Sequence, residues 1–382
     1  MVGAVRMVGA VEMVESVRMV EVGTNTAVAE LTEQLKAEAQ RLGFVLAGVT
    51  EAAAPPRLES FYAWLEAGFA GQMHYLSERR LAYAHPRHVL DGCRSILMLA
   101  LPYQPVTPDS GPTPAEAHQT DACWGKVARY AQGEIDYHDV IHARLKSLRN
   151  WLLHRCPGAA VRGVVDTAPL LERELAAAAG LGWIGKNTLL LNRRWGSAFF
   201  LAAVLTDVEL RPDEPLHTAH CGSCTACLDA CPTQAFPRPF VLDATRCISY
   251  LTIEHREAVS AELRSQLEGW VFGCDICQEV CPWNRHAAKQ RLGEPGEAAF
   301  APRDDLNPLD LLGVLELDDE HFRQRFRHTP LWRAKRRGLL RNAILVAGTR
   351  RPPQALPSLM RLCSDAEPLI QEAARWAVRQ YP

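Results

Sequence analysis

Eight of the twelve cysteines fall between residues 221 and 281, and their spacing is typical of iron–sulfur ligands. The first group reads C-x2-C-x2-C-x3-C-P and consists of Cys221, Cys224, Cys227 and Cys231. In bacterial ferredoxins, the first three thiolates of this pattern bind one cluster and the fourth binds a second cluster. The pattern therefore requires a partner group, and C-x2-C-x3-C-P supplies it as Cys274, Cys277 and Cys281.

The partner group is one cysteine short, because Val271 occupies the position where a complete pattern has its first cysteine. Reciprocal ligation assigns the first 4Fe–4S cluster to Cys221, Cys224, Cys227 and Cys281. The second cluster takes Cys231, Cys274 and Cys277, and Cys247 is the nearby cysteine that completes it. Two C-x2-C pairs also suit structural zinc. The two C-x3-C-P endings and the total of eight ligands favour two 4Fe–4S clusters.

The overall composition is that of an ordinary globular protein, with 48% hydrophobic and 23% charged residues. The net charge of −2 predicts no general attraction to nucleic acid, so any such affinity requires a local patch. Residues 1–25 repeat a Met-Val pattern that charged residues interrupt, so they lack the apolar stretch of a signal peptide. We expect these residues to be a disordered tail or the product of an early start codon. We expect a cytoplasmic monomer without a membrane partner.

Residues 26–210 alternate buried strands with helical patterns, which is typical of an α/β domain. Strands are expected at residues 44–50, 95–103 and 161–166. Helices are expected at residues 26–42, 57–68, 137–154 and 169–180.

Three further segments follow from composition. Residues 105–122 are polar and rich in proline, which predicts a surface loop. Residues 211–300 are expected to form a ferredoxin-like module around the cysteines. Residues 301–382 contain three short amphipathic patterns, at 337–348, 354–365 and 367–380, which fit a pair of HEAT-like helical repeats.

Asp166 is the candidate catalytic residue, because it ends a strand, and carboxylates at strand ends often face a ligand crevice. Burial would raise its pKa and make it a general acid. The alternative is a cap for the following helix, which the residues alone favour. His138 is either a metal ligand or a packed side chain. The D-x-H-x-x-G signature of cobalamin proteins fails here, because Ile141 occupies its glycine position.

The segment GLGWIGKNT (180–188) contains two phosphate-binding patterns that its context excludes. A dinucleotide loop must follow a strand, whereas this segment follows a helical pattern. Asn187 stands where a P-loop needs serine or threonine. A glycine-rich turn near a large ligand and a plain helix-ending turn both remain open.

The region from Arg323 to Arg351 is basic and contains no acidic residue. Such a run predicts a face that binds phosphates, with a solvated helix surface as the alternative. We therefore expect a nucleic acid to contact Arg333, Lys335, Arg336, Arg337, Arg341 and Asn342.

Together these residues resemble the epoxyqueuosine reductase family from about residue 30 to the end. The resemblance rests on VVDTAPLLERELAAAAGLGWIGKNTLL, CGSCTACLDACPTQAF, CISYLTIEHR, GCDICQEVCPWN and RGLLRN. It implies an N-terminal cobalamin-binding domain, a two-cluster module and a HEAT-like C-terminal domain. Family members reduce epoxyqueuosine at the wobble position of tRNA to queuosine. The resemblance therefore implies cobalamin in its base-off form, a tRNA partner, and an external flavoprotein or ferredoxin as electron donor.

The resemblance also assigns roles to single residues. Asp166 matches the proton donor, Cys247 the cluster ligand outside the two patterns, and Arg341 and Asn342 the tRNA-facing segment. The positions near cobalamin are Arg129, Asp166, Lys186, Asn187, Thr188, Ser249 and Asp275. Family members usually contain Y-A-x-G-x-D-Y-H, with one residue between the glycine and the aspartate. This sequence departs from that pattern because two residues separate Gly133 from Asp136, so the roles of residues 130–138 stay open. Two alternatives remain, a cobalamin-dependent reductive dehalogenase and an electron-carrier subunit.

Overall fold

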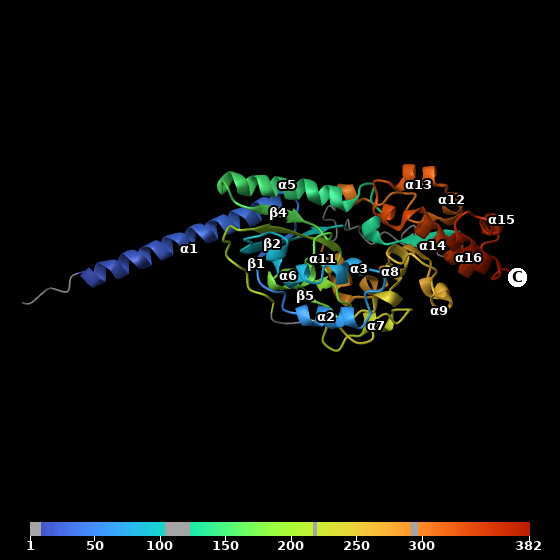
Figure 1. Ribbon diagram of the computed structural model, residues 1–382, viewed down its shortest axis with the longest axis horizontal. Helices are drawn as coiled ribbons and strands as arrows, with labels where there is room; N and C mark the ends of the chain where they lie inside the picture. The colour runs from blue at the N-terminus through green and yellow to red at the C-terminus, as the bar shows by residue number, and fades with distance from the viewer. Residues whose placement is uncertain (1–8, 104–122, 217–219, 292–296) are drawn as a thin grey trace, which may run out of the picture.

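The computed structural model describes residues 9–103, 123–216, 220–291 and 297–382, with side chains described from residue 25 onward. The first helix, α1 (Gly9–Arg41), extends beyond the rest of the molecule in Figure 1. It includes the helix expected at residues 26–42 and continues back through residues 9–25, where the sequence predicted a tail or an early start. The loop expected at residues 105–122 lies outside the described residues.

An antiparallel sheet forms the centre of the N-terminal lobe, which we define as residues 26–210. Its strand order is β1-β2-β7-β4. Its strands are β1 (Leu46–Glu51), β2 (Ser95–Pro102), β4 (Val161–Val164) and β7 (Phe199–Thr206). Every pairing in this sheet is antiparallel, whereas successive βαβ units would give parallel strands. The lobe is therefore mixed α+β, and the α/β expectation was wrong in strand direction.

Strand β2 lies between two layers because both of its faces are apolar. All of its residues are buried, and successive side chains point to opposite faces. Leu97 and Leu99 join the core beneath α1 and α5 (Tyr137–Arg155), whereas Ile96 and Met98 join the core beneath α6 (Glu172–Ala178). Figure 1 shows α5 and α6 on opposite sides of the sheet.

A second sheet connects the three segments that the sequence predicted as separate domains. It has the order β8-β3-β9. One strand comes from each segment: β3 (Trp124–Val127), β8 (Trp270–Phe272) and β9 (Leu309–Asp310). One apolar core also extends from Val127 and Phe272 to Ile344 and Ala373 of the C-terminal helices. The cluster module and the helical segment therefore share a core.

The three helices expected at the C-terminus are present, and the first is central to the segment. They are α14 (Lys335–Arg350), α15 (Leu356–Leu362) and α16 (Pro368–Val378), preceded by α12 (Leu311–Leu315) and α13 (Asp319–Phe326). Residues 338–348 of α14 are all buried, as expected of a helix that is surrounded by other elements. A Cβ atom at Gly348 would lie 2.7 Å from Trp376 and 2.8 Å from Ala377, so glycine lets α16 pack closely.

The cluster module, residues 211–300, is built from short helices, and a two-stranded hairpin of the N-terminal lobe packs against it. The helices are α7 (Ala226–Asp229), α8 (Ile248–Ile253), α9 (Ala261–Arg264), α10 (Ile276–Glu279) and α11 (Pro282–Gln290). The hairpin pairs β5 (Trp183–Ile184) with β6 (Leu190–Leu191). Two further helices of the N-terminal lobe, α2 (Leu58–Glu66) and α3 (His74–Glu78), lie on the same side as α7 and α8 in Figure 1. Within the described ranges, no helix is both long and apolar enough to cross a bilayer.

Candidate active site and cluster ligands

The structure brings the eight clustered cysteines together in two neighbouring groups. In the first group, Cys227 lies within electrostatic range of Cys221, Cys224 and Cys281. The second group consists of Cys231, Cys247, Cys274 and Cys277. All eight are free thiols. These are the two sets expected from spacing and reciprocal ligation, including Cys247 as the member outside both patterns.

The two cysteine groups differ in their access to solvent. Cys224 of the first group is exposed, and so are its neighbours Gly222, Ser223 and Thr225. No cysteine of the second group is exposed. There the backbone N–H groups that begin α8, including that of Ser249, hydrogen-bond the Cys247 sulfur. The first group therefore faces the surface and the second faces the interior.

The GLGWIGKNT segment connects the two cysteine groups through its hairpin turn. Lys186 donates hydrogen bonds from Nζ to the carbonyl oxygens of Gly222 (2.7 Å) and Cys224 (2.9 Å). Asn187 Nδ2 donates to the carbonyl oxygen of Cys277 at 3.4 Å. Because the segment is a hairpin between β5 and β6, it is neither a dinucleotide loop nor a P-loop, as the sequence indicated.

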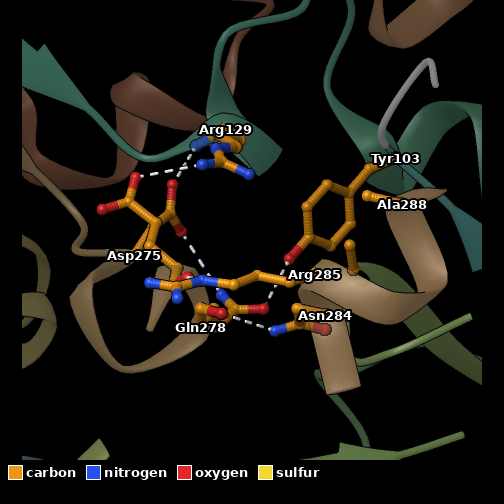
Figure 2. Close-up of a pocket in the computed structure, with 9 residues that line it drawn as sticks. Tyr103, Arg129, Asp275, Gln278, Asn284, Arg285 and Ala288 are labelled. Atoms are coloured by element: carbon orange, nitrogen blue, oxygen red, sulfur yellow. Dashed lines mark hydrogen bonds and ion pairs between the residues drawn. The ribbon is translucent and has the colours of Figure 1, made fainter. Parts of the chain in front are cut away.

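Asp275 links the second cysteine group to the N-terminal lobe. Its buried carboxylate accepts a hydrogen bond from the Arg129 backbone N–H at 2.7 Å. Figure 2 shows these two residues at one side of a small cavity of about 150 Å³, with Tyr103, Gln278 and Arg285 around it. Tyr103 donates its hydroxyl to Gln278 Oε1 at 3.1 Å. This cavity therefore lies directly behind the segment that carries Cys274 and Cys277.

A larger cavity of about 620 Å³ lies where the N-terminal lobe, the cluster module and the C-terminal segment meet. Aromatic side chains form much of its wall, among them Tyr130, Tyr137, Phe272 and Trp332. Three cations line its rim: Arg256, Arg333 and Lys335. The Phe272 wall comes from β8, two residues before Cys274, so this cavity adjoins the second cysteine group.

Asp166 belongs to a hydrogen-bonded network at this larger cavity. Its Oδ1 lies 2.8 Å from His138 Nε2, and its Oδ2 accepts a hydrogen bond from the Tyr137 hydroxyl. The other ring nitrogen of His138, Nδ1, lies 2.7 Å from Asp136 Oδ1. Asp136 also caps α5 by accepting from the His138 backbone N–H. The cap at the start of α5 therefore fixes the imidazole that faces Asp166.

The protonation of this network differs from the expectation. Burial alone would raise the pKa of Asp166, but the hydrogen bond and charge of His138 outweigh burial and lower it. Burial alone would lower the pKa of His138, but its bonds to Asp136 and Asp166 raise it to about 9. The proton therefore resides on His138 at neutral pH, and the expectation that burial keeps Asp166 protonated was wrong. The cap alternative was also wrong, because α6 starts at Glu172 with Leu171 as its N-cap.

The loop that carries Asp166 has a strained backbone and a buried neighbour. Asp166 has a φ of 34°, a left-handed value that is uncommon for a residue other than glycine. Strain of this kind clusters at active sites, where surrounding contacts hold it in place. Glu172 lies beside this loop; its Oε1 is buried, and no hydrogen-bond partner for that atom is found within the described ranges. Burial, with the nearby charge of Asp166, raises the pKa of Glu172 to about 8, so this carboxyl is mostly protonated at pH 7.

The residues expected near cobalamin do not gather in one pocket. Asp166 lies at the larger cavity, whereas Lys186, Asn187, Ser249 and Asp275 hydrogen-bond the backbone or sulfur atoms around the two cysteine groups, or the adjacent Arg129. Thr188, at a φ of 66°, accepts hydrogen bonds from Arg173. Most of these side chains thus hold the cysteine segments in place.

The basic C-terminal region does not form one exposed face. Arg341 and Asn342 are buried, with exposures of 1% and 0%, so the expectation that they contact tRNA was wrong. Arg341 donates to the carbonyl oxygens of Leu251, His255 and Glu257. These acceptors lie some ninety positions earlier in the chain, where the local sequence gives no warning of them.

The other four cations predicted to contact tRNA have acidic partners from other elements or line the cavity. Arg336 pairs with Asp365 at 3.2 Å, and Arg337 pairs with Glu367 at 3.4 Å. Arg333 pairs with Glu254 at 2.5 Å and lines the larger cavity, as does Lys335. Of the six predicted tRNA contacts, Arg333 and Lys335 are the two that reach a cavity wall.

Sequence reasoning missed several residues of the larger cavity. Tyr75 and Trp332 belong to no motif, whereas Arg256 ends the CISYLTIEHR segment but received no role. A signal did exist for Asp136 and His138, because D-x-H places Asp136 at the N-cap and His138 in the first turn of a helix. The sequence left the roles of both residues open.

The first cysteine group includes the exposed Cys224, and the second group adjoins a cavity where His138 holds a proton. This arrangement is that of a two-cluster iron–sulfur oxidoreductase. Two family models match the chain: the 4Fe-4S double cluster binding domain at residues 220–284, and epoxyqueuosine reductase QueG, DUF1730, at residues 84–167. The epoxyqueuosine reductase of Pseudomonas aeruginosa is 38% identical over 359 residues, covering 92% of this chain and 95% of the relative. That of Escherichia coli is 34% identical and covers 92% and 89%. The chain belongs to the epoxyqueuosine reductase family.

Solved structures agree with this assignment. An epoxyqueuosine reductase crystallised with an epoxyqueuosine-modified tRNA-Tyr stem loop superposes with a TM-score of 0.81 and 29% identity, covering 92% of this chain and 90% of that chain. The Bacillus subtilis enzyme, solved with its catalytic aspartate loop swung out of the active site, gives a TM-score of 0.80 and 28% identity, covering 92% and 90%.

Proposed function

We propose that this oxidoreductase reduces epoxyqueuosine in tRNA to queuosine, with electrons passed through two 4Fe–4S clusters to the larger cavity. The reaction converts an epoxide to an alkene and water, and it consumes two electrons and two protons. The observation that carries the proposal is the position of the Asp166–His138 pair at a cavity that adjoins the second cysteine group. Family membership supports the substrate.

The two cysteine groups support a direction for the electrons. The first cluster would be held by Cys221, Cys224, Cys227 and Cys281, and the second by Cys231, Cys247, Cys274 and Cys277. Because Cys224 is exposed, electrons enter at the first cluster. The second cluster, behind Phe272 and Asp275, delivers them to the cavity.

The larger cavity also suits the cobalamin that the resemblance implies. Its aromatic walls fit a flat macrocycle, and about 620 Å³ of space accepts part of so large a ligand. Both ring nitrogens of His138 hydrogen-bond carboxylates, so this imidazole would not serve as a ligand of the cobalt. The base-off form of cobalamin stays an implication of the resemblance. When bound, cobalamin supplies a strongly reducing, nucleophilic cobalt centre.

Asp166 and His138 together hold and transfer the proton that the opening epoxide needs. His138 stores the proton at neutral pH because two carboxylates stabilise its charge. As negative charge develops on the epoxide oxygen, His138 Nε2 gives its proton to the Asp166 carboxylate, which passes it on to that oxygen. Tyr137 holds the other oxygen of Asp166 by its hydroxyl group and fixes the direction of transfer.

The rim of the cavity supports a nucleic acid substrate. Arg256, Arg333 and Lys335 come together there, next to Glu254, which pairs with Arg333. Guanidinium and ammonium groups bind phosphates, and tRNA brings phosphates on both sides of the modified base. Trp332 also lines the cavity, with Lys335 Nζ 4.4 Å from its ring centre and the Phe322 ring stacked against it.

The test is a turnover assay. Anaerobically reconstituted protein is supplied with a reductant and an epoxyqueuosine-modified tRNA stem loop, and nucleosides are quantified by mass spectrometry. The expected result is queuosine in place of epoxyqueuosine. Protein with full cluster content and cobalamin that leaves the epoxide intact would contradict the proposal.

A further inference from the structure

The surface around the first cysteine group is basic and lacks an assigned use. The segments 183–196, 220–240 and 281–291, which surround these cysteines, contain seven lysines and arginines and a single acidic residue, Asp229. The chain as a whole carries a net charge of −2, so this concentration is local. Asp229 accepts a hydrogen bond from Thr225, and its single negative charge leaves these segments strongly basic.

Hydrogen bonds place two of these cations beside the exposed loop at residues 222–225: Lys186, which donates to its carbonyl oxygens, and Arg193, which contacts His220. His220, adjacent to Cys221, lies 3.0 Å from Arg193. Its ring also packs against Trp283 of α11, with ring centres 5.7 Å apart. Because Cys281 is the N-cap of α11, this helix leads directly away from the first cluster.

The exposed side chains on this helix are also basic. Arg285, His286 and Lys289 are exposed, and Lys289 lies about 12 Å along the helix from Cys281. We call the set of Arg193, Arg194, His220, Arg285, His286 and Lys289 the basic rim. Of the other cations in these segments, Arg291 is buried against Trp195, whereas Arg238 is exposed.

An apolar contact lies on the other side of the same loop. Phe240 is 40% exposed, and its backbone N–H donates to the carbonyl oxygen of Lys186. Lys186 in turn binds the carbonyl oxygens of Gly222 and Cys224. The exposed cluster loop therefore lies between the basic rim and an exposed aromatic ring.

We infer that the basic rim and Phe240 form the docking surface for a small acidic ferredoxin, which delivers one electron at a time to the first cluster. The inference rests on the proposed function, because that reaction needs two electrons per turnover. Charge complementarity selects an acidic partner and accelerates encounter. Electron-transfer complexes bury little surface, below about 1,200 Å² in total, which suits a rim of this extent.

The redox step balances with the donor that the inference names. A reduced [2Fe–2S] ferredoxin loses one electron and the oxidised first cluster gains it, with no bond formed or broken. Two such encounters supply one turnover. Plant-type ferredoxins are low-potential donors, and their potentials lie within the range that 4Fe–4S clusters span.

RNA is the competing occupant, because its phosphates also seek basic surfaces. Two observations favour the protein carrier. Cys224 is exposed at the centre of this surface, where a one-electron carrier needs close approach and RNA gains nothing from it. The cavity rim formed by Arg256, Arg333 and Lys335 already offers cations beside the site where the modified base must enter.

The test uses the charge-reversal variant Arg193→Glu/Lys289→Glu, with Lys146→Glu as the matched control. Lys146 is exposed on α5, which lies on the opposite side of the molecule from α7 in Figure 1. Stopped-flow absorbance measures how fast a reduced plant-type ferredoxin bleaches the clusters of the intact protein. Calorimetry measures binding of the oxidised ferredoxin at several salt concentrations.

We expect the double variant to lower the second-order rate constant about tenfold or more at low salt. The dissociation constant should rise by a similar factor, and the salt dependence of both should flatten. Lys146→Glu should behave as the wild type. Photoreduced deazaflavin, a small reductant, should reduce all three proteins equally, which shows that their clusters are intact. If the double variant loses its clusters, Arg193→Gln/Lys289→Gln replaces it with an expected loss of about threefold.

Three results would overturn the inference. The first is a double variant that ferredoxin reduces and binds as it does the wild type. The second is unchanged ferredoxin kinetics with weakened binding of a tRNA stem loop, which would assign the surface to RNA. The third is a dependence seen with a flavodoxin and not with the ferredoxin. None of these readouts needs epoxyqueuosine, so failure of the docking surface and failure of the proposed reaction are distinguishable.

Discussion

The cysteine module and the basic C-terminal region both have strong patterns in the sequence. The pattern of the cysteines predicted their arrangement in the structure, whereas the pattern of the basic residues did not. The spacing of eight cysteines predicted two groups of four, and the structure brings those groups together. The run of cations predicted one face, and the structure disperses it. Arg341 is buried under carbonyl oxygens, Arg336 pairs with Asp365, and Arg333 lines a cavity.

The difference has a physical reason. Cluster ligation fixes which positions along the chain must meet, because each short helical turn presents thiols at set intervals. A cation can be neutralised by any acid or carbonyl that the fold brings near. The partners of Arg341 belong to residues 251–257, and no spacing rule connects them to α14. A motif whose residues must bind the same cluster therefore predicts which residues meet in the structure. A run of like charge does not predict where its side chains lie.

Removal of Cys247 should have the largest effect. Cys247→Ser takes one ligand from the second cluster, so iron content should fall from about eight to about four atoms per chain, and turnover should be abolished. Iron analysis and the turnover assay check this. Cys363→Ser is the matched control and should keep the full iron content and the wild-type turnover. Full iron content in Cys247→Ser would break the assignment made by counting.

Asp166→Asn should come next. Loss of the group that delivers the proton should lower the turnover rate about 10²- to 10⁴-fold, while the cluster spectrum stays intact. Asp139→Asn, an exposed neighbour on α5, serves as the control. Turnover by Asp166→Asn at the wild-type rate would remove Asp166 from the mechanism.

Arg341→Ala sharpens the comparison within the basic region. The substitution leaves several buried carbonyl oxygens without donors, so the free energy of unfolding should fall by about 3 kcal/mol or more. Arg333→Ala breaks a half-exposed ion pair and should cost less than about 1 kcal/mol. Urea midpoints of anaerobic protein give both values. Equal shifts for the two variants would contradict the structural role of Arg341.

The pH dependence should show the smallest effect near neutrality. Because the pKa of His138 is raised to about 9, turnover should stay constant from neutral pH and fall about tenfold per unit above about 9. The associated stability is fully present below about pH 6.5 and is lost as the pH rises through about 9. His138→Asn should lack this alkaline fall. A fall centred near pH 6.5 would show that Asp136 and Asp166 do not stabilise the imidazolium.

Apolar periodicity predicted the strands β1, β2 and β4 and seven of the helices with rough bounds. It did not predict the other strands, among them β7 of the central sheet. It did not predict strand direction, since antiparallel pairs such as β2 and β7 depend on how the chain returns between them. It also missed the shared sheet of β3, β8 and β9, whose short strands pair across more than 140 positions.

Some parts of the site could be predicted from the sequence and others could not. The spacing of the cysteines predicted seven cluster ligands, counting the ligands added Cys247, and a position at a strand end indicated Asp166. The pairing of Asp166 with His138 spans 28 positions and follows from no local rule. Consequently, the sequence located the proton on the wrong member of the pair.

The central claim is that electrons held on the two clusters reduce the epoxide in the larger cavity. The most direct test mixes pre-reduced protein, with no other reductant present, with an epoxyqueuosine-modified tRNA stem loop. Cluster absorbance and queuosine are then followed in the same reaction. We predict that the clusters reoxidise as queuosine forms, with two electrons lost per product. Queuosine that forms while the clusters remain reduced would contradict the account.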